Sequence, residues 1–377
     1  MKKLLLILAA ACLLIGCSNE KTFTISGTLT DFGNPDEPTM LYLKTRDMNE
    51  QLIVIDSTFL NKNESFVLKG KSSETDLYFL ADKDNVFVMR IFVDPGNKIK
   101  VTGSAVIISE IQIEGSETHT FYKDYIALLD PILDEQEDIR QNYSMQVAYF
   151  ENGIISQEEF QQIEDDLVAY FNFLEDELSN VTLDFIATHP NHIIAAYLVY
   201  RNALSLSLSA EIEAQLLLLS PDMSNKFVTY IKQIIERIKQ TEVGSVLPNI
   251  ELPDSEGNLI STESLRGKYV LIDFWATWCT PCIREIPNLK DLYAKYNEKG
   301  FEIYGISLDM DKDAWLSSLI RYDLSWINVT DLDGSPTARQ MSIQYIPHTF
   351  LLGPDGVIIA VNLREEALAN KLAELMP

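Results

Sequence analysis

The first third of the chain alternates short apolar runs with turn-forming residues. The runs TFTISGTL, LIVIDSTFL, VFVMRIFV and AVIISEIQIE lie between Thr22 and Glu114, and GNP, KNE and PGN separate them. Period-two patterns broken by Gly, Pro and Asn are typical of antiparallel strands joined by tight turns. The pattern therefore predicts a small β-sandwich within residues 17–115.

The apolar period changes to that of a helix over residues 116–242. The run SQEEFQQIEDDLVAYFNFLEDEL begins with Ser156 three residues before Glu159, which is the spacing of a capping box. Apolar positions such as Phe160, Leu167 and Leu174 recur at helical spacing, which predicts a core-facing strip. With HIIAAYLVYRNAL and SNKFVTYIKQIIERIKQ further on, this stretch predicts a helical region.

From residue 243 to residue 377, strand-like and helical patterns alternate. Strands are predicted at VLIDFW, FEIYGISLD, WINVTD, TFLLG and VIIAVN; helices are predicted at CIREIPNLKDLYAKYNE, at 312–322 and at EEALANKLAELM. Such alternation predicts an α/β domain whose sheet carries helices on both faces. A site where a strand ends and a helix begins fits the rule for such sheets.

The amino terminus has the composition of an export signal. Lys2 and Lys3 precede the apolar stretch LLLILAAACLLI, which is too short to span a membrane. The segment Leu14–Cys17 resembles a bacterial lipobox, which implies a lipoprotein signal peptide at 1–16 and a lipid anchor on Cys17. The alternative is an ordinary cleaved signal with a chance cysteine. In either case the chain leaves the cytoplasm, and an anchor at Cys17 would hold the β-rich domain close to a bilayer.

The chain is strongly acidic, with a formal net charge of −26 over 377 residues. Loss of Lys2 and Lys3 with the leader makes it more acidic still. Such a charge argues against nucleic acid as a partner and against electrostatic binding to anionic lipid. The sequence contains no glycine-rich nucleotide fingerprint, so we expect no cofactor and expect reducing equivalents to arrive by thiol exchange.

Two cysteines follow the predicted strand VLIDFW, as Cys279-Thr280-Pro281-Cys282. At the start of the next predicted helix, Cys279 would meet unpaired N–H groups and the positive end of the helix dipole, which favour a thiolate. A zinc site is the alternative for a CxxC motif. The other two of the four cysteines, Cys12 and Cys17, lie at the leader, so no second pair remains and we expect no metal site.

The segment DFWATWCTPCIREIP resembles the active site of thioredoxin-like proteins position by position. IQYIPHTFLL resembles the segment that holds their cis-proline, which would place Pro347 beside the dithiol. The lead-in LPNIELPDSEGNLISTESLRGKYVLIDFW and the tail GPDGVII resemble the TlpA/ResA branch of periplasmic thiol-disulfide oxidoreductases. The resemblance covers residues 243–377 and implies a thioredoxin-like fold there. More weakly, the preceding regions resemble the amino-terminal extension of a lipoprotein subgroup.

The chemistry expected of this segment is disulfide exchange. Cys279 would attack a substrate disulfide, and Cys282 would then attack the mixed disulfide and release the product. Asp273 lies in an apolar strand, where a buried acid with a raised pKa can accept the Cys282 proton. The alternative is an Asp273 that is only hydrogen-bonded locally. The strand FEIYGISLD lacks the lysine that pairs with the buried acid in thioredoxin, so we expect Asp273 to titrate high.

The expected substrate surface surrounds the dithiol. Its residues are Trp278, Thr280, Pro281, Ile346 and Pro347. A cis Pro347 would leave backbone free to pair with an extended peptide. Trp275 is expected in the core and His348 in an exposed loop, whereas Glu285 either tunes a pKa near the dithiol or faces water.

Three functions remain open at this stage. The first is an envelope-tethered reductase in the periplasm that keeps exported proteins, such as apocytochrome c, reduced; the resemblance implies that a membrane thiol transporter recharges it. The second is an oxidase or isomerase, and the third a non-enzymatic binding lipoprotein with a static disulfide. The absence of His between the cysteines favours the reductase. Peroxidase chemistry fits less well, because Ala276 stands where that motif has Thr.

Overall fold

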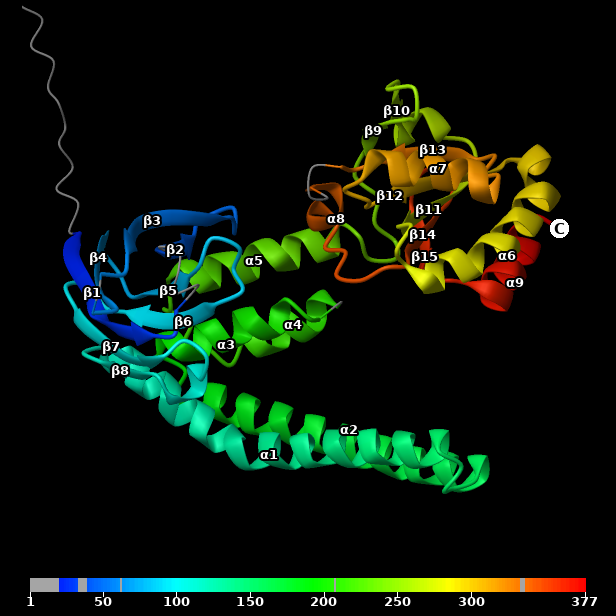
Figure 1. Ribbon diagram of the computed structural model, residues 1–377. Helices are drawn as coiled ribbons and strands as arrows, with labels where there is room; N and C mark the ends of the chain where they lie inside the picture. The colour runs from blue at the N-terminus through cyan, green and yellow to red at the C-terminus, as the bar shows by residue number, and fades with distance from the viewer. Residues whose placement is uncertain (1–19, 33–38, 62, 207, 333–335) are drawn as a thin grey trace, which may run out of the picture. The chain divides into compact units, whose positions relative to one another are not determined.

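The computed structural model describes residues 20–32, 39–61, 63–206, 208–332 and 336–377 (Figure 1). Contacts divide the chain into two compact units. One runs up to Phe185 and includes His192–Ile194, and the other comprises Ile186–Asn191 and Ala195–Pro377. No helix within the described ranges is both long enough and apolar enough to span a bilayer.

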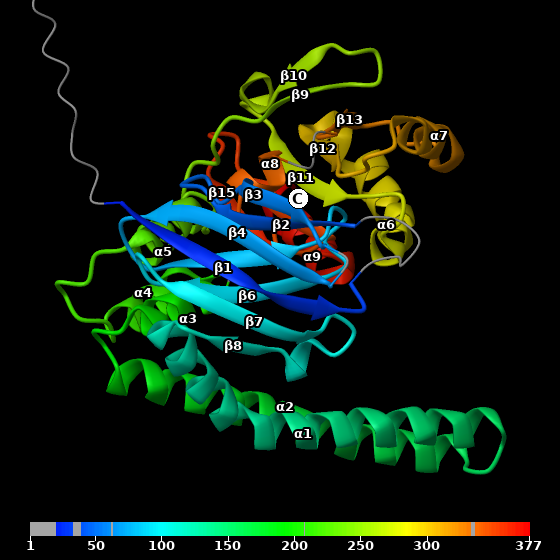
Figure 2. The same cartoon turned by 60° about the vertical axis from the view of Figure 1, so that its left-hand side comes forward.

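The first unit begins with two sheets packed face to face, in which most neighbouring strands are antiparallel. One sheet has the order β4-β1-β7-β8 and the other β3-β2-β5-β6, and Figure 2 shows the first of them broadside. The strands are β1 (Lys21–Thr30), β2 (Met40–Arg46), β3 (Leu52–Phe59), β4 (Ser65–Ser72), β5 (Asp76–Ala81), β6 (Val88–Val93), β7 (Lys98–Ser104) and β8 (Gln112–Glu114). This is the β-rich sandwich that the alternating pattern predicts.

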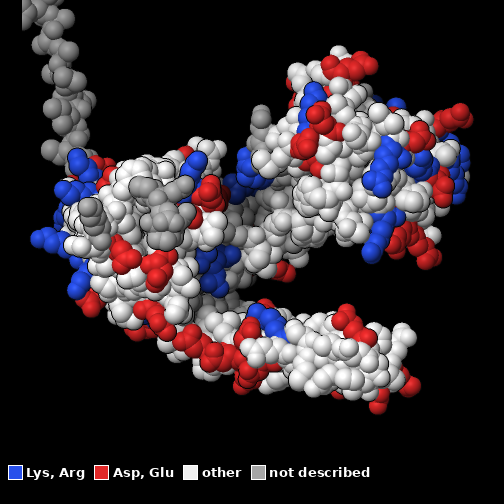
Figure 3. All heavy atoms as spheres, viewed as in Figure 1, with Lys and Arg blue, Asp and Glu red and all other residues white. Residues whose placement is uncertain are grey.

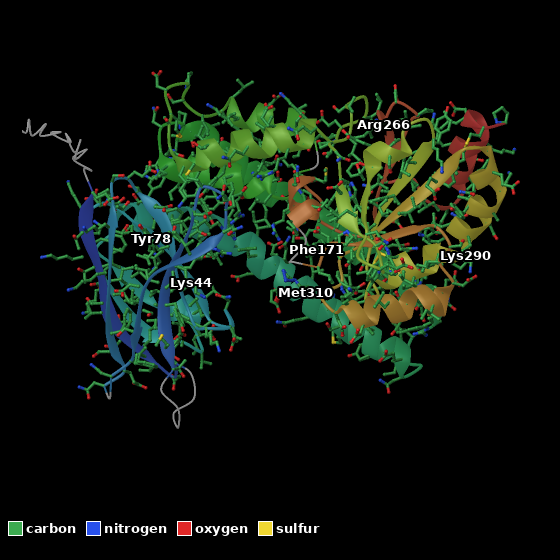
Figure 4. The ribbon with its side chains drawn as sticks, turned by 90° about the horizontal axis from the view of Figure 1, so that it is seen from above. Lys44, Tyr78, Phe171, Arg266, Lys290 and Met310 are labelled. Atoms are coloured by element: carbon green, nitrogen blue, oxygen red, sulfur yellow. A yellow bond between two sulfur atoms is a disulfide. The ribbon has the colours of Figure 1, made fainter. Side chains whose placement is uncertain are left out.

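Alternation along each strand supplies the core of the sandwich. In β1, Phe23, Ile25 and Leu29 are fully buried, and Phe23 meets the ring of Tyr78 edge to face at 4.8 Å. Tyr78 is labelled within this domain in Figure 4. Gly27 is required for close strand packing, because a Cβ there would lie 1.7 Å from the carbonyl oxygen of Val101.

The strand predicted at 105–114 is only partly correct. A 3-10 turn occupies Ile108–Glu110, and β8 is confined to Gln112–Glu114. Val106 is 76% exposed, so apolar character in this run does not reflect burial in a sheet.

Two long helices follow, α1 (Glu117–Glu151) and α2 (Gln157–Thr188). The capping box at the start of α2 is confirmed, because the Ser156 N–H donates to Glu159 at 2.9 Å and the Glu159 N–H donates to Ser156 at 3.2 Å. The expected core strip of α2 is wrong in part, since Leu174 is buried but Phe160 and Leu167 are only half-buried. In a hairpin of two helices, the apolar strip of one helix packs against the other helix alone. The edges of the strip therefore stay open to solvent.

The second unit contains the remaining helices of the middle region and an α/β domain. The former are α3 (Ile193–Ala203), α4 (Ser209–Leu216) and α5 (Lys226–Lys239). The α/β domain comprises β9 (Glu251–Pro253), β10 (Leu259–Ser261), η2 (Thr262–Leu265), β11 (Tyr269–Trp275), α6 (Thr280–Tyr296), η3 (Asn297–Lys299), β12 (Phe301–Ser307), α7 (Lys312–Tyr322), β13 (Ile327–Thr330), α8 (Pro336–Gln340), β14 (His348–Leu352), β15 (Ile358–Val361) and α9 (Glu365–Leu375).

The central sheet of this domain has the order β13-β12-β11-β14-β15. β11, β12 and β13 run parallel, and β14 and β15 are antiparallel to their neighbours. Helices α6 and α9 pack on one face, around Leu271 and Leu351, while α8 and the lead-in segment pack on the other, around Ile272 and Phe350. This is the thioredoxin-like α/β fold expected for residues 243–377.

Candidate active site

The predicted dithiol lies between the end of β11 and the first turn of α6. Cys279 is the N-cap of α6, and it forms a disulfide with Cys282, one helical turn further on, with 5.3 Å between the Cα atoms. The Cys279 sulfur accepts the backbone N–H of Cys282 at 3.2 Å. Because the N–H groups of a first helical turn have no partner within the helix, this geometry favours a thiolate on Cys279 once the disulfide is reduced.

Both sulfurs are shielded by aromatic and aliphatic neighbours. Cys279 and Cys282 are 5% and 4% exposed, and they form a buried cluster with Trp275, Ala276 and Trp315. Trp315 comes from α7, and the sequence analysis did not anticipate it. Trp275 is core, as expected. A low-polarity surrounding of this kind strengthens each nearby electrostatic interaction.

The residues predicted to meet substrate border this cluster. Trp278 is 67% exposed, and Thr280 and Pro281 occupy the first two exposed positions of α6. Ile346 packs against the buried cluster, and the Ile346–Pro347 peptide bond is cis. Of the five predicted residues, Trp278, Thr280 and Pro281 are exposed, Ile346 is half-buried and Pro347 is buried, and their contact with substrate remains a prediction.

Asp309 fixes the loop that carries Trp278, and the sequence analysis missed it. Its carboxylate is 2% exposed and accepts the backbone N–H of Thr277 with both oxygens at 3.1 Å, as well as the Thr277 hydroxyl at 2.6 Å. The Ser307 hydroxyl donates to it at 2.7 Å. Because a buried polar group left without a partner is costly, these hydrogen bonds hold the approach to Cys279 in one conformation.

Asp273 lies on the α6 side of the sheet. Along β11 the side chains alternate, so Leu271, Asp273 and Trp275 share a face; Leu271 packs against α6 and Trp275 packs against the two cysteines. Asp273 is therefore placed between these contacts, beneath the helix that carries Cys282. Its carboxyl group is 8% exposed, as the sequence predicts for a buried acid.

Burial raises the pKa of Asp273 to about 7, with a small further rise from Glu285, whereas Arg364 opposes the shift. A carboxyl group with a pKa in this range can take up and give back a proton near neutral pH. The absence of a lysine from β12 agrees with this high pKa. Glu285 belongs to the same site, since its carboxylate accepts the Glu365 N–H at 2.9 Å.

Arg364 is the cation that sequence reasoning did not find. Its guanidinium donates to the carbonyl oxygen of Pro347, and its charge acts on Asp273. The flanking residues Asn362 and Glu365 have positive φ, 57° and 46°, which is an unusual backbone for side chains of this kind. This turn thus links the cis-proline segment to the buried acid. In the sequence, the only indication of this role is a basic residue just before the last predicted helix.

His348 is not the exposed loop residue that the sequence suggested. It begins β14, pairs with Phe274 across the sheet and packs on the ring of Phe350 at 4.9 Å. Burial and the nearby Arg364 charge lower its pKa to about 4. At neutral pH it is therefore uncharged, and it offers the dithiol no cation.

Two further predictions concern other positions. Cys17 and the leader at 1–16 lie outside the described residues, so the lipid anchor remains a prediction. Within the described ranges no cluster of three His, Cys, Asp or Glu side chains is arranged to hold a metal ion.

Two regions of the chain match known protein families. Residues 243–361 match the AhpC/TSA family, and residues 23–122 match a domain of unknown function, DUF4369. The second match falls on the β sandwich and the first turns of α1.

Named relatives match about a third of the chain. Thiol-disulfide oxidoreductase ResA of Bacillus cereus is 33% identical over 142 residues, covering 37% of this chain and 82% of that protein. ResA of Bacillus subtilis is 34% identical over 122 residues, covering 31% of this chain and 65% of that protein.

Solved structures that match include a thiol-disulfide oxidoreductase from Bacteroides fragilis, with 39% identity, a TM-score of 0.33, and coverage of 36% of this chain and 99% of that one. The thioredoxin domain of a thiol-disulfide oxidoreductase from Bacteroides vulgatus has 34% identity and a TM-score of 0.35, with coverage of 36% and 99%.

Proposed function

This chain belongs to the ResA family of thiol-disulfide oxidoreductases, and from that premise we propose that it works as a reductase of exported proteins. The observation that carries the proposal is the Cys279–Cys282 pair at the start of α6, with the buried acid Asp273 on the strand beneath it. Such a pair can cycle between dithiol and disulfide without rebuilding the fold. The exposed Trp278 beside the dithiol suits a protein substrate.

In the proposed reaction the reduced Cys279 thiolate attacks one sulfur of a substrate disulfide. That S–S bond breaks, a mixed disulfide forms, and the substrate's other sulfur leaves as a thiolate. Cys282 then loses its proton to Asp273 and attacks the Cys279 sulfur, which releases the second substrate thiolate. The substrate gains two electrons, and the Cys279–Cys282 pair becomes a disulfide.

We infer the direction of transfer from what surrounds the thiolate. A cation that stabilises the thiolate stabilises the reduced pair and makes it more oxidising. Thr280 and Pro281 carry no charge, and His348 is neutral at pH 7. The Cys279 thiolate is therefore helped mainly by the helix start, which supports a reductase over an oxidase or isomerase.

We place the protein in the cell envelope, with the thioredoxin-like domain in the periplasm. Support comes from the composition of residues 1–16, which is that of an export signal, and from the lipobox-like Leu14–Cys17 segment, which would carry the anchor on Cys17. Substrates would be disulfide-containing exported proteins, of which apocytochrome c is one candidate, and a membrane thiol transporter would supply electrons. We further propose domain limits at 17–115, 116–242 and 243–377; the family match beginning at residue 243 supports the last of these.

The proposal predicts stoichiometric reduction of a disulfide peptide. Residues 18–377, which keep every described residue, are reduced, freed of reductant and mixed with a peptide that contains one disulfide. We expect one peptide disulfide to be lost for each Cys279–Cys282 disulfide that forms, as measured by mass spectrometry of alkylated products. Reduction that stops far short of one equivalent, with efficient oxidation of a peptide dithiol instead, would favour the oxidase or isomerase. If the pair does not exchange at all, the result would support the third function, a non-enzymatic binding lipoprotein.

A further inference from the structure

One outward sheet face of the β domain is basic, although the chain as a whole is acidic. In β4 and β7, buried residues such as Leu68 and Ile99 alternate with exposed ones. The exposed positions are Val67 and four lysines, which are Lys69, Lys71, Lys98 and Lys100. Because side chains of a strand point alternately to opposite faces, these four lysines all point away from the core. We call them the lysine face.

The strand register gathers these lysines at one end of the sheet. Thr24 of β1 lies opposite Lys69 on one side and opposite Lys98 on the other. Neighbouring strands are about 4.8 Å apart, so the backbones that carry Lys69 and Lys98 are only about 10 Å apart. In the adjacent rows, Lys71 lies opposite Thr22 and Lys100 lies opposite Ser26. Small hydroxyl side chains on β1 leave the lysines unobstructed.

The local charge stays positive after nearby acids are counted. Glu114 lies opposite Lys100, Asp56 accepts the Lys69 backbone N–H at 2.8 Å, and Glu20 precedes the exposed Lys21. Among the described residues, the ion pairs involve none of the four lysines. In Figure 3 basic side chains gather along the margin formed by β1, β4 and β7.

The chain enters the sandwich at this same end. Lys21 is the first residue of β1, and its side chain lies beside Gly96 in the turn that leads into β7. Three residues separate Cys17 from Lys21, so four residue-to-residue steps join them, a reach of roughly 14 Å at full extension. A lipid on Cys17 would therefore keep the lysine end of the sheet nearest the bilayer.

We propose that the lysine face docks on the anionic headgroups of the bilayer that holds the chain. Charge complementarity and the point at which the chain enters the domain both favour lipid as the occupant. The inference is independent of the dithiol chemistry. It differs from the expectation drawn from net charge alone, because the charge of this face is local.

Screening explains how a basic face can act within an acidic protein. The Debye length is about 8 Å at physiological ionic strength, so acidic side chains farther from the headgroups repel them only weakly. Each lysine close to an anionic leaflet strengthens binding by about fivefold. A lipid tether makes the contact intramolecular, and modest intrinsic affinity then suffices to orient the domain.

Vesicle sedimentation tests the proposal with residues 18–377, which lack the anchor. We expect binding to vesicles of phosphatidylcholine with phosphatidylglycerol at low salt, no binding to phosphatidylcholine alone, and loss of binding at high salt. Replacing Lys69, Lys71, Lys98 and Lys100 with Gln should lower the partition coefficient at least about tenfold.

The matched control replaces four exposed lysines of the other unit with Gln and makes the same change in net charge. These are Lys232, Lys295, Lys299 and Lys312. The control should bind as the unaltered chain does, and thermal unfolding should confirm that both variants fold. Equal loss of binding in both variants, or no binding to anionic vesicles, would overturn the proposal. Lysine-dependent self-association without vesicles, seen by analytical ultracentrifugation, would assign the face to an acidic second copy instead and also overturn it.

Discussion

Replacing Cys279 with Ser should abolish disulfide exchange, whereas replacing Cys282 with Ser should leave a protein that attacks substrate and then stays bound to it. The two cysteines are the two halves of one disulfide, but only Cys279 caps α6 and accepts the helical N–H of Cys282. The nucleophile is therefore expected to be Cys279, and loss of it should lower the rate of peptide reduction at least about 1,000-fold.

The Cys282→Ser variant should accumulate a mixed disulfide through Cys279, because the resolving thiol is gone. Mass spectrometry after reaction with the disulfide peptide would show one peptide attached at Cys279, and the same variant expressed in cells would retain its natural partners for identification. The Cys279→Ser variant is the matched control and should capture no peptide. Capture through Cys282 in that control would reverse the assigned roles.

Replacing Asp273 with Asn should slow release of substrate at least about 100-fold at pH 8, with little effect on formation of the mixed disulfide. Burial places the pKa of Asp273 at about 7, so the carboxylate that receives the Cys282 proton is present above that pH and lost below it. In the unaltered chain the rate of the second step should therefore rise with pH through about 7. In the Asn variant this step should lose its inflection near 7. Stopped-flow measurement of both steps across pH would reveal it.

A substitution of Arg364 should shift the pH dependence of the second step and not remove it. Its charge opposes the rise in the Asp273 pKa, so Arg364→Gln should move the inflection to higher pH while leaving the base in place. An unchanged profile in both variants would show that Asp273 is only a locally hydrogen-bonded group.

The raised pKa of Asp273 also affects the stability of the folded chain, and this effect is opposite in sign to the expected effect of Asp273→Asn on the reaction. Burial raises the Asp273 pKa from 3.8 to about 7 in the folded chain. Between these values the folded state holds the proton more tightly, so this group lowers the free energy of unfolding as pH rises from about 4 to 7. Asp273→Asn should thus be more stable than the unaltered chain at pH 8, by an amount on the order of a few kcal/mol. Slow release in a stabilised variant cannot be ascribed to unfolding.

Local pattern was sufficient for most elements of the α/β domain. The runs VLIDFW, FEIYGISLD and TFLLG correspond to β11, β12 and β14, and a helix over residues 312–322 matches α7. These elements are buried on both faces or strongly periodic, which makes their sequence patterns clear. The run at 105–114 forms a strand only at its end, because Val106, Ile107 and Ile108 are exposed, and burial cannot be read from composition.

Motif spacing found the dithiol, the buried acid and the cis-proline segment, because these residues lie in or beside one recognisable strand and turn. Arg364, Asp309 and Trp315 could not be found in the same way. Each reaches the site only through packing of a distant element: the segment before α9, the end of β12 and α7 respectively. His348 was misplaced for a related reason, since its burial depends on β11 lying beside it.

The reduction potential of the Cys279–Cys282 pair tests the central claim most directly. Residues 18–377 would be equilibrated with defined dithiol–disulfide buffers, and the fraction of free thiols counted at each ratio. The proposed reductase predicts a value near thioredoxin's roughly −270 mV, or lower. A value above roughly −180 mV would contradict it and point to an oxidase or isomerase.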